Sequence, residues 1–390
     1  DEMERVTENM KGDFVGIGIN FYMFRDTITV TRTIKGGPSQ RRGLRPGDKI
    51  LMADKDTLFN QKLSNAEIVN RLNGQEGSEV VLTVYRKSED RTFKMRLQRD
   101  HVPLRSIDAY YMISPDMGYM RMNRFAESTF DEFRKALREL ERNGAQKLVL
   151  DLRDNPGGYL NVAEEIADVF LPKNRLILFT KNKKGQIDST FATSRGGFED
   201  KPVYVLINER SASASEIIAG ALQDNDVGTI VGRRSFGKGL VQREMALGDG
   251  SAVRLTVSRY YTPTGRSIQR EYENGTEDYY HRYMQRYDNG ELGSADSIKV
   301  ADSLRFVTPG GKVVYGGGGI IPDVFVPIGS NEEEALAALD ARGFFSSFGF
   351  EHLEEDRGRY SDYSAEAFRE SFKADDILFE SFIDFMGRYN

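Results

Sequence analysis

The sequence predicts a mixed α/β fold, preceded by a small β-rich module and followed by a helical segment. Strand and helix patterns alternate from about 117 to 232, which is typical of an α/β layer with a largely parallel sheet. Short alternating segments separated by glycine fill residues 12–100, and a helical pattern rich in acidic residues and phenylalanine fills residues 331–390. We therefore expect four parts: a lead-in over 1–11, the β-rich module, an α/β core over 101–330 and a helical extension.

The composition limits both the class of protein and its partners. The chain has 390 residues, of which 39% are hydrophobic and 29% charged, as in globular proteins with a sizeable core. The net charge of −6 argues against a nucleic-acid partner, which a strongly basic surface would attract. The absence of cysteine excludes disulfides, thiolate metal sites and cysteine nucleophiles, and is compatible with an oxidising compartment such as a periplasm.

The start of the chain, DEMERVTENM, has no signal peptide, and no apolar run in the sequence is long enough to span a membrane. We expect the lead-in to be the remnant of a longer N-terminal region.

The β-rich module is predicted to hold four strands and one helix, from its hydrophobic periodicity. The strands are FVGIGINF, TITVTRTI, DKILMAD and EVVLTVYRK, and NAEIVNRLNG is a helix between the last two. GLRPGDKI is a turn that leads into a strand.

The α/β core begins with a strand at GYMRMNRF and a helix at STFDEFRKALRELERNG, with Ser128 or Thr129 as N-cap and Gly144 past its end. The further strands are KLVLDLR, RLILFTK, PVYVLIN and VGTIVG, and the further helices are NVAEEIADVFL and ASEIIAGALQD. REMALGDGSAVRLTVSRYYTP then predicts a β-hairpin with GDG at its turn. Residues 276–306 are polar and rich in tyrosine, which indicates a surface insertion.

Lys238 lies in GRRSFGKGLVQ, which fits two lysine motifs only in part. A phosphate-binding loop needs a Ser or Thr after the lysine and then a helix, whereas Gly239 follows here and the next residues read as extended. The S-x-x-K motif of penicillin-recognising enzymes needs a helical turn from Ser235 to Lys238, which Gly237 and Gly239 disfavour. The lysine is better explained as a buried, neutral general base for a serine elsewhere.

The stretch INERSASASEIIAGALQD offers that serine. A strand runs there into a turn that opens a helix, so that a serine side chain points outward beside backbone N–H groups. Another strand ends in the Pro-Gly-Gly turn of LVLDLRDNPGGYL, which is suited to offer N–H groups to an oxyanion. From the residues alone, Ser211, Ser213 and Ser215 remain open as simple helix caps, and the Pro-Gly-Gly segment remains open as an ordinary loop.

Taken together, these stretches resemble the carboxy-terminal processing proteases, also called tail-specific proteases. The resemblance runs from about 12 to 328, through GIGI, GLRPGDKI, LDLRDNPGG, SASASEI, FGKGLVQ, YYTPTGRSIQ and YGGGGIIPDV in the family's order. These enzymes are serine–lysine endopeptidases with an inserted PDZ domain. The resemblance implies a ClpP/crotonase-like α/β protease core over 101–330 and a PDZ domain over 12–100.

The resemblance also implies roles for individual residues. Ser213, the middle serine of SASAS, corresponds to the nucleophile, and Lys238 to the general base. Gln242 corresponds to the residue that orients the lysine, and positions four apart in a strand do point to one face. Glu216 is then a first-turn helix acid favoured by the helix dipole.

The oxyanion hole of the family is built from backbone amides of two turns. They carry over to Gly158 and Ala214, with Gly157 as the weaker assignment. Ser211 and Ser215 are then caps or scaffold.

For the PDZ-like module, the resemblance implies capture of a substrate's C-terminus. Amides around Ile17, Gly18 and Ile19 would receive the terminal carboxylate, and the tail would add as a strand to an open sheet edge. Ile17, Ile19, Ile68 and Leu72 indicate an apolar pocket.

The expected function is a PDZ-regulated serine endopeptidase that acts on unfolded or flexible protein C-termini through an acyl-enzyme. No metal or organic cofactor is implied, and three histidines with no cysteine leave little material for a metal site. The resemblance places the protein in a bacterial periplasm or cell envelope, and FFSSFGF and FESFIDFM in the tail indicate helix packing or contacts in a homo-oligomer. Two alternatives stay open: a catalytically silent peptide-binding scaffold, and a serine hydrolase of non-peptide esters or amides.

Overall fold

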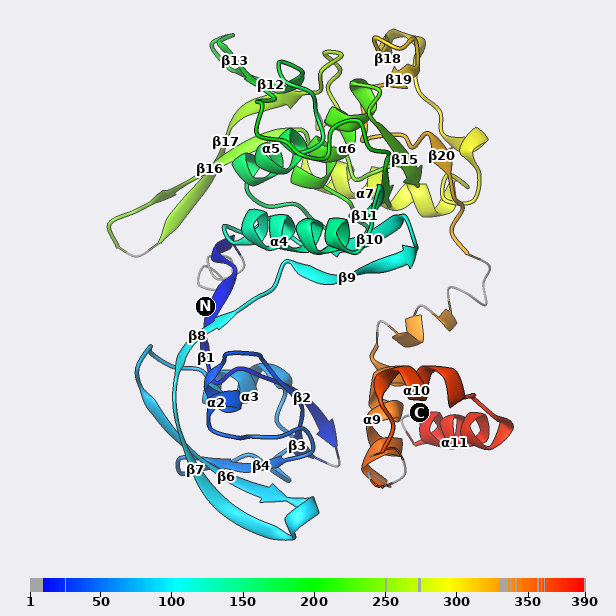
Figure 1. Cartoon of the computed structure of the whole chain (residues 1–390). Coiled ribbons are helices and arrows are strands. Elements are labelled where there is room, and N and C mark those ends of the chain that lie inside the picture. The colour runs from blue at the N-terminus through cyan, green and yellow to red at the C-terminus, as the bar shows by residue number, and fades with distance from the viewer. Residues whose placement is uncertain are drawn as a thin grey trace. The chain divides into compact units, whose positions relative to one another are not determined.

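The computed structural model describes residues 10–388 except 25, 250, 273–274, 330–334, 337, 341, 356–357, 359 and 361. Most of the predicted lead-in, residues 1–9, therefore lies outside the described residues. The chain forms two compact units, the first from residues 1–13 and 104–328 and the second from residues 14–103 and 329–390. Figure 1 follows the chain through both units.

The first unit is built on a six-stranded sheet with the order β20-β15-β14-β11-β10-β9. Its strands are β9 (Ile107–Ser114), β10 (Met117–Met122), β11 (Lys147–Asp151), β14 (Val203–Ile207), β15 (Gly228–Gly232) and β20 (Val324–Phe325). Neighbours from β10 to β20 run parallel, and only β9 pairs antiparallel. The predicted largely parallel sheet is confirmed, as a mixed sheet with one antiparallel edge.

A second sheet in this unit has the order β13-β12-β17-β16. Its strands are β12 (Leu176–Asn182), β13 (Ile187–Phe191), β16 (Leu240–Ala246) and β17 (Ala252–Tyr261). The predicted hairpin is confirmed as β16 and β17, which extend beyond the body of the unit in Figure 1. The placement of RLILFTK in the parallel sheet is wrong, because β12 pairs antiparallel with β13 and β17 instead.

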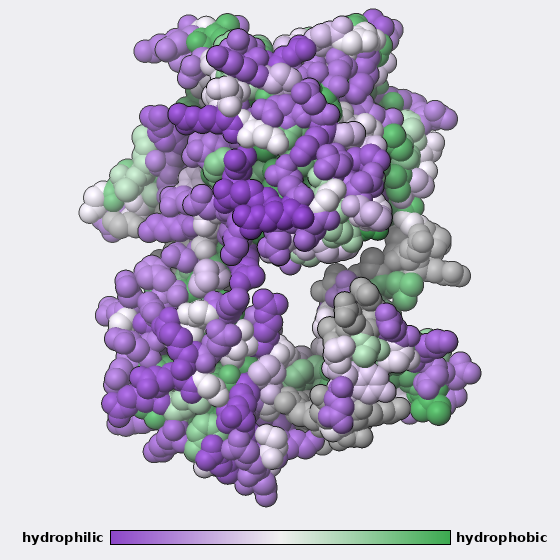
Figure 2. Space-filling view, in the orientation of Figure 1, coloured by the Kyte–Doolittle hydropathy of each residue, from purple (hydrophilic) through white to green (hydrophobic). Residues whose placement is uncertain are grey.

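Three predicted helices pack with these sheets: α4 (Thr129–Arg142), α5 (Leu160–Asp168) and α6 (Ala214–Asp224). α4 contacts β9 and β10, while α6 contacts β15 of the first sheet and β12 of the second. Phe133, Leu137 and Leu140 of α4 recur at helical spacing and are buried. The outer face of α4 is charged, and Figure 2 shows a hydrophilic surface over it.

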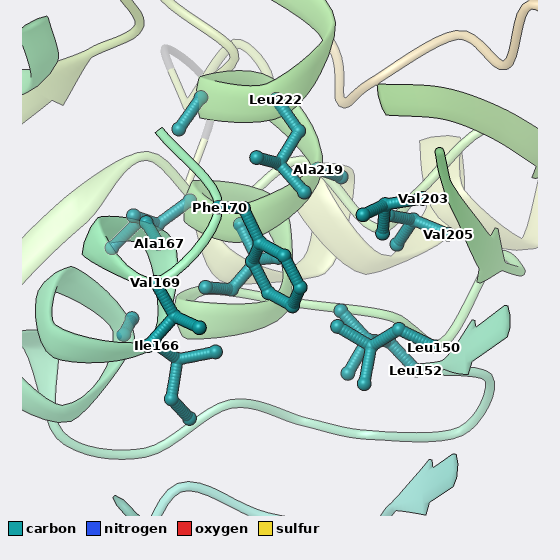
Figure 3. Packing of buried hydrophobic residues seen from close by; sticks show 14 of the residues in the cluster. Leu150, Leu152, Ile166, Ala167, Val169, Phe170, Val203, Val205, Ala219 and Leu222 are labelled. Atoms are coloured by element: carbon teal, nitrogen blue, oxygen red, sulfur yellow. The ribbon is translucent and has the colours of Figure 1, made fainter. Parts of the chain in front are cut away.

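The core of this unit lies between the strands and helices. Figure 3 shows Phe170 between the strand residues Leu150 and Val205 and the helix residue Leu222. Phe170 is fully buried and meets the rings of two other phenylalanines edge to face at 5.8 and 6.0 Å. Burial of a side chain of this size stabilises the fold by about 2–3 kcal/mol, so this layer holds the strand ends firmly in place.

The predicted insertion forms the helix α7 (Thr276–Asp288) and two short turns, η2 (Ala295–Ser297) and η3 (Asp302–Leu304). Two short strands follow, β18 (Arg305–Val307) and β19 (Val313–Tyr315). One side of α7 is exposed, with Tyr280 at 55%, whereas Arg286 on its last turn is 2% exposed. The insertion therefore packs into the unit along one side.

The second unit holds a sheet of order β2-β3-β4-β6-β7, with β5 beside β4. Its elements are β2 (Ile19–Phe24), β3 (Thr27–Thr33), α2 (Pro38–Arg41), β4 (Lys49–Ala53), β5 (Asp56–Thr57), α3 (Asn65–Leu72), β6 (Glu79–Arg86), η1 (Lys87–Glu89) and β7 (Arg91–Gln98). β1 (Asp13–Gly16) and β8 (Asp100–Pro103) form a separate pair. The predicted single strand FVGIGINF is wrong, because it breaks into β1 and β2 around Gly18, where φ is 73°.

β7 is absent from the predicted strands, although Phe93, Met95 and Leu97 alternate with polar residues there. The helix α3 is confirmed, and it starts with a capping box in which Ser64 and Glu67 satisfy each other's backbone amides.

The described part of the C-terminal extension contains α9 (Phe344–Glu355), α10 (Ala365–Ser371) and α11 (Asp376–Gly387). Phe348 of α9 lies 5.2 Å from the ring of Phe382 and 5.6 Å from that of Phe385. The phenylalanine-rich stretches thus pack helix against helix, as expected. Among the described helices, none is long and apolar enough to cross a membrane.

Candidate active site

Three loops that follow neighbouring parallel strands meet at one edge of the main sheet. Residues 152–159 follow β11, residues 208–213 follow β14 and residues 233–239 follow β15. The carboxyl ends of parallel strands share an edge, so loops that leave them are neighbours. A cavity of about 600 Å³ opens here. Of the residues predicted for the site, the cavity is lined by Gly157, Gly158, Ser213, Lys238 and Gln242.

Ser213 is the residue immediately before α6, and its backbone is strained. Its φ of 55° and ψ of −113° lie in a region that non-glycine residues rarely adopt. The fully buried Ser211 donates from Oγ to the carbonyl of Leu152 at 2.8 Å, and the fully buried Ser215 donates to that of Asn155 at 3.0 Å. Ser211 and Ser215 are therefore scaffold, and Ser213 is the serine of the three that lines the cavity.

The Pro-Gly-Gly turn packs so closely against its neighbours that a side chain would not fit at either glycine: Gly157 faces the turn that carries Ser213 (residues 208–213, the serine turn), and Gly158 faces the backbone of Phe125. A Cβ on Gly157, where φ is 97°, would lie 2.7 Å from the Cβ of Ser213, and a Cβ on Gly158 would lie 2.1 Å from a backbone oxygen. The N–H of Gly157 is already used, since it donates to Oδ1 of Asn155 at 2.9 Å. Across the described residues, the N–H groups of Gly158 and Ala214 donate to no acceptor. These two amides are the ones available to a ligand.

Glu216, in the first turn of α6, joins the serine turn to the loop that carries Lys238 (residues 233–239, the lysine loop). Its fully buried carboxylate accepts four hydrogen bonds. Oε2 accepts from the amides of Ser213 and Lys238, each at 2.9 Å. Oε1 accepts from the amide of Gly237 at 2.6 Å and from Oγ of Ser235 at 2.5 Å. Burial raises the pKa of Glu216, and the four hydrogen bonds oppose that rise. The residue has a larger structural role than the helix acid we expected.

The environment of Lys238 favours its neutral form. Burial lowers the pKa of Lys238, the charge of Arg254 lowers it further, and Glu216 opposes both effects. The buried hydroxyl of Tyr260 lies 3.2 Å from the carbonyl oxygen of Ser213 and 3.1 Å from that of Lys238. Burial raises the pKa of Tyr260 well above its ordinary value, so the hydroxyl stays a donor to these two carbonyls.

Gln242 lines the same cavity as Lys238, but the reason we gave for their proximity does not apply. β16 begins only at Leu240, and its pairing with β17 shifts register between Val241 and Gln242. Such an irregularity changes the face to which following side chains point. Within the described structure, no hydrogen bond joins the side chains of Ser213, Lys238 and Gln242.

The residues predicted for peptide binding lie in the second unit. Ile17, Ile68 and Leu72 are 3%, 0% and 3% exposed and belong to its apolar core, against which Ile19 packs. They are thus core side chains in this structure. The amides of Ile17 and Gly18 donate to no acceptor among the described residues, and β2, which starts at Ile19, is an edge strand.

Comparison with known proteins identifies the family. Residues 15–97 match the sequence profile of the PDZ domain, and residues 116–279 match that of peptidase family S41. The chain belongs to peptidase family S41. The resemblance to carboxy-terminal processing proteases is thereby confirmed.

Two curated relatives illustrate the similarity of this S41 chain. A carboxy-terminal-processing protease of Bartonella bacilliformis is 38% identical over 274 residues, which are 69% of this chain and 62% of the relative. A probable CtpA-like serine protease of Staphylococcus aureus is 35% identical over 271 residues, which are 69% of this chain and 53% of the relative. The match thus spans 53–62% of the length of these relatives. A solved photosystem II D1 C-terminal processing protease is 24% identical, with a TM-score of 0.43 over 84% of this chain and 75% of that one.

Sequence reasoning missed the roles of Glu216 and Tyr260 in this S41 site. The link from Glu216 to the lysine loop has a local signal, because Ser213 and Glu216 have the S-x-x-E spacing of a capping box, but the spacing does not reveal the second loop. Tyr260 stands in the motif YYTPTGRSIQ without any local sign of its role. It meets the carbonyl of Ser213 across 47 residues of sequence, a contact that only the fold creates.

Proposed function

We propose that this S41 chain is a PDZ-regulated serine endopeptidase that captures flexible C-terminal tails of proteins and hydrolyses peptide bonds in them. One observation carries the proposal. A single cavity is lined by Ser213, whose strained backbone sits at a helix start, and by Lys238, whose pKa burial lowers. A serine beside a neutral lysine can act as nucleophile and base without histidine. The names of the two curated relatives support the same activity.

In the proposed reaction, Oγ of Ser213 attacks the substrate carbonyl carbon and passes its proton to neutral Nζ of Lys238. The oxyanion accepts hydrogen bonds from the amides of Gly158 and Ala214, which have no other acceptor among the described residues. The lysine then protonates the leaving amine, and the C–N bond breaks to leave an ester on the serine. A water molecule then gives a proton to the lysine and attacks the ester carbon. The bond from this carbon to Oγ breaks, the lysine returns the proton to Oγ, and the carboxylic acid product leaves. We assign Gln242 the task of orienting the lysine.

Residues 12–100, proposed as the PDZ domain, would supply substrate selection. The amides of Ile17 and Gly18 would bind the terminal carboxylate, and the peptide would pair with the edge strand β2. The apolar residues Ile19, Ile68 and Leu72 would contact the last side chain of the tail after a shift of the core.

We further propose that residues 101–330 form a ClpP/crotonase-like core and that residues 331–390 serve as an extension. We also propose that the protein acts in a bacterial periplasm or cell envelope.

The test is cleavage of an unfolded protein with a free C-terminus by the purified chain. We expect Ser213→Ala and Lys238→Ala to abolish cleavage, and Lys238→Arg to be nearly inactive because guanidinium does not deprotonate near neutral pH. Ser189→Ala, at an exposed position of β13, is the matched control and should retain wild-type activity.

The outcomes separate the alternatives. Equal turnover by wild type and Ser213→Ala would exclude Ser213 as the nucleophile and favour a silent peptide-binding scaffold. Hydrolysis of small esters without any protein cleavage would point to a non-peptide hydrolase. A substrate with an amidated C-terminus tests the PDZ role, since it should be cleaved more slowly than the free acid.

A further inference from the structure

The loop of residues 233–239, which carries Lys238, is held by more than Glu216. Side chains from α7 and from the segment before it also contact this loop. The proposed reaction uses neither α7, which belongs to the tyrosine-rich insertion, nor the segment before it. The contacts involve one buried arginine on α7 and one aromatic cluster.

Arg286 is the buried arginine. Its side chain is 3% exposed, and its guanidinium donates from Nη1 to the carbonyl of Ser235 at 2.7 Å and from Nη2 to that of Gly318 at 2.8 Å. Glu291 lies 3.5 Å from Nε of Arg286 and also receives two hydrogen bonds from Arg234, the second residue of the lysine loop. A forked donor of this kind fixes two carbonyls in one geometry, which a single ammonium group does not do.

The aromatic cluster surrounds Arg270. Its guanidinium carbon lies 4.3 Å from the ring centre of Phe236, 4.0 Å from that of Tyr279 and 5.1 Å from that of Tyr283. Nε and Nη2 of Arg270 are buried without a hydrogen-bond partner among the described residues, so the ring faces take the place of acceptors. The amide of Arg270 also donates to the carbonyl of Gly237 at 3.1 Å. We call Arg270 with these three rings the Arg270 cluster.

These contacts matter because the two residues on either side of the lysine have no side chains that could hold it in place. Lys238 lies between Gly237 and Gly239, and Gly237 has a φ of 90°. A Cβ on Gly237 would lie 2.6 Å from Cγ of Arg270, so the cluster and the loop backbone are in direct contact. The position of the lysine is therefore set by the groups packed around it.

We propose that α7 and the segment before it position the active site. Arg286 of α7 and the Arg270 cluster together fix the loop that carries the general base. Arg286 acts through the backbone at Ser235, and Tyr279 and Tyr283 act through Phe236. The role of Lys238 as the base rests on the proposed function, whereas the placement of its loop can be measured without catalysis.

Release of this loop would change the surroundings of Lys238 in a predictable direction. The charges of Glu216 from α6 and Arg254 from β17 act on it, and the hydroxyl of Tyr260 from β17 bonds to its carbonyl. Four more charged or titratable residues line the same cavity: Lys11, Arg124, Tyr159 and Glu244. Burial is the largest cause of the lowered pKa of Lys238. A loop that moves would admit water to the amine, and the pKa would rise towards its ordinary value.

The test compares Arg286→Gln with Arg282→Gln. Arg282 is the matched control, because it lies on the same helix but pairs with Glu271 at 2.6 Å and Asp278 at 2.8 Å, both outside the lysine loop. The readout is the pH midpoint for acetylation of Lys238 by acetic anhydride, followed by mass spectrometry, which needs no peptidase activity. kcat and KM for an unfolded protein substrate give the second readout.

For Arg286→Gln we expect the acetylation midpoint of Lys238 to rise by about one pH unit and kcat to fall at least about tenfold, with KM nearly unchanged. Arg282→Gln should change none of these. An unchanged midpoint together with unchanged kcat in Arg286→Gln would overturn the proposal. If Arg286→Gln fails to fold, Tyr279→Leu, which weakens the Arg270 cluster alone, should shift the midpoint in the same direction by less, and no shift there would overturn it as well.

Failure of the proposed function gives a different result. The wild-type chain would then cleave nothing, while the acetylation midpoint of Lys238 would still respond to Arg286→Gln.

Discussion

The backbone amide of Lys238 donates a hydrogen bond of 2.9 Å to the carboxylate of Glu216, 22 residues earlier in the chain. The same oxygen accepts from the amide of Ser213 at 2.9 Å. One buried carboxylate therefore sets the distance between the backbones of the two residues to which we assign the chemistry. The assembly of the site depends on a group that never touches substrate in the proposed reaction.

Glu216→Gln should disrupt this arrangement. The amide oxygen of glutamine can accept only part of the four hydrogen bonds, and its NH₂ group would face donors. We expect a loss of about 3–5 kcal/mol in the free energy of unfolding and a fall in kcat/KM of at least about a hundredfold, measured by denaturant titration and peptide cleavage.

The control for this change is Glu141→Gln, which removes only a partly exposed pair with Lys201 at 2.7 Å. It should cost less than about 1 kcal/mol and leave kcat/KM unchanged. Equal losses in the two variants would show that Glu216 has no special place in the site.

The pH dependence of the wild type should follow Lys238. Only the neutral amine accepts a proton, so kcat/KM should rise with pH through the lowered pKa of this lysine. Arg254→Gln removes a positive charge that lowers that pKa, and the acid limb should move to higher pH. Arg254 is 43% exposed and paired with Glu244, so the shift should be small, and salt should reduce it.

Arg259→Gln on the same strand is the comparison for Arg254, because Arg259 is not among the charges that shift the lysine. A pH profile that is flat between mildly acidic and alkaline conditions would contradict a lysine base. A shift of the acid limb to lower pH in Arg254→Gln would contradict the assigned electrostatics.

Gly158→Ala tests the oxyanion hole. The new Cβ would lie 2.1 Å from a backbone oxygen, so the turn must move and its free amide with it. Removal of one such donor typically costs about 10²–10³ in kcat. Gly185→Ala is matched to it, since Gly185 has a φ of 82° but no atom within 4 Å of an added Cβ. Gly185→Ala should lower the free energy of unfolding by only about 1 kcal/mol and leave kcat unchanged. A similar kcat in both variants would show that the amide of Gly158 is not part of the oxyanion hole.

The sequence predicted much of the fold because its signals are local. The helix over 129–142 and the parallel strands KLVLDLR and PVYVLIN are specified by hydrophobic periodicity within each segment. The placement of RLILFTK in the main sheet failed because a strand's own residues do not say which neighbour it pairs with. β12 pairs with β17 of the hairpin instead, and α5 and α6 pack against β12.

The site shows the same division between local and long-range information. The turns around Ser213 and Gly158 carry recognisable glycine, serine and proline patterns, so they could be read from the sequence. Three of the four hydrogen bonds of Glu216, and the two that Arg286 donates to carbonyls, join residues that are 19 to 51 positions apart. The sequence of each segment alone does not identify its partner. Residues that hold a site together are harder to predict than residues that carry its motif.

Tyr260→Phe tests whether the hydroxyl of Tyr260 helps to hold the backbones of Ser213 and Lys238 in place, because the substitution removes only one oxygen atom. The Tyr260 hydroxyl bonds to the carbonyls of Ser213 and Lys238, at 3.2 and 3.1 Å, and its loss leaves both without this donor. We expect about 1–2 kcal/mol lower stability and about a tenfold lower kcat. Tyr261→Phe should change neither, because the ring of Tyr261 stacks on Phe179 at 4.9 Å and phenylalanine keeps that contact. A Tyr260→Phe variant with wild-type kcat would mean that the two backbones keep their places without this hydroxyl, through Glu216 and the other groups packed around the loop.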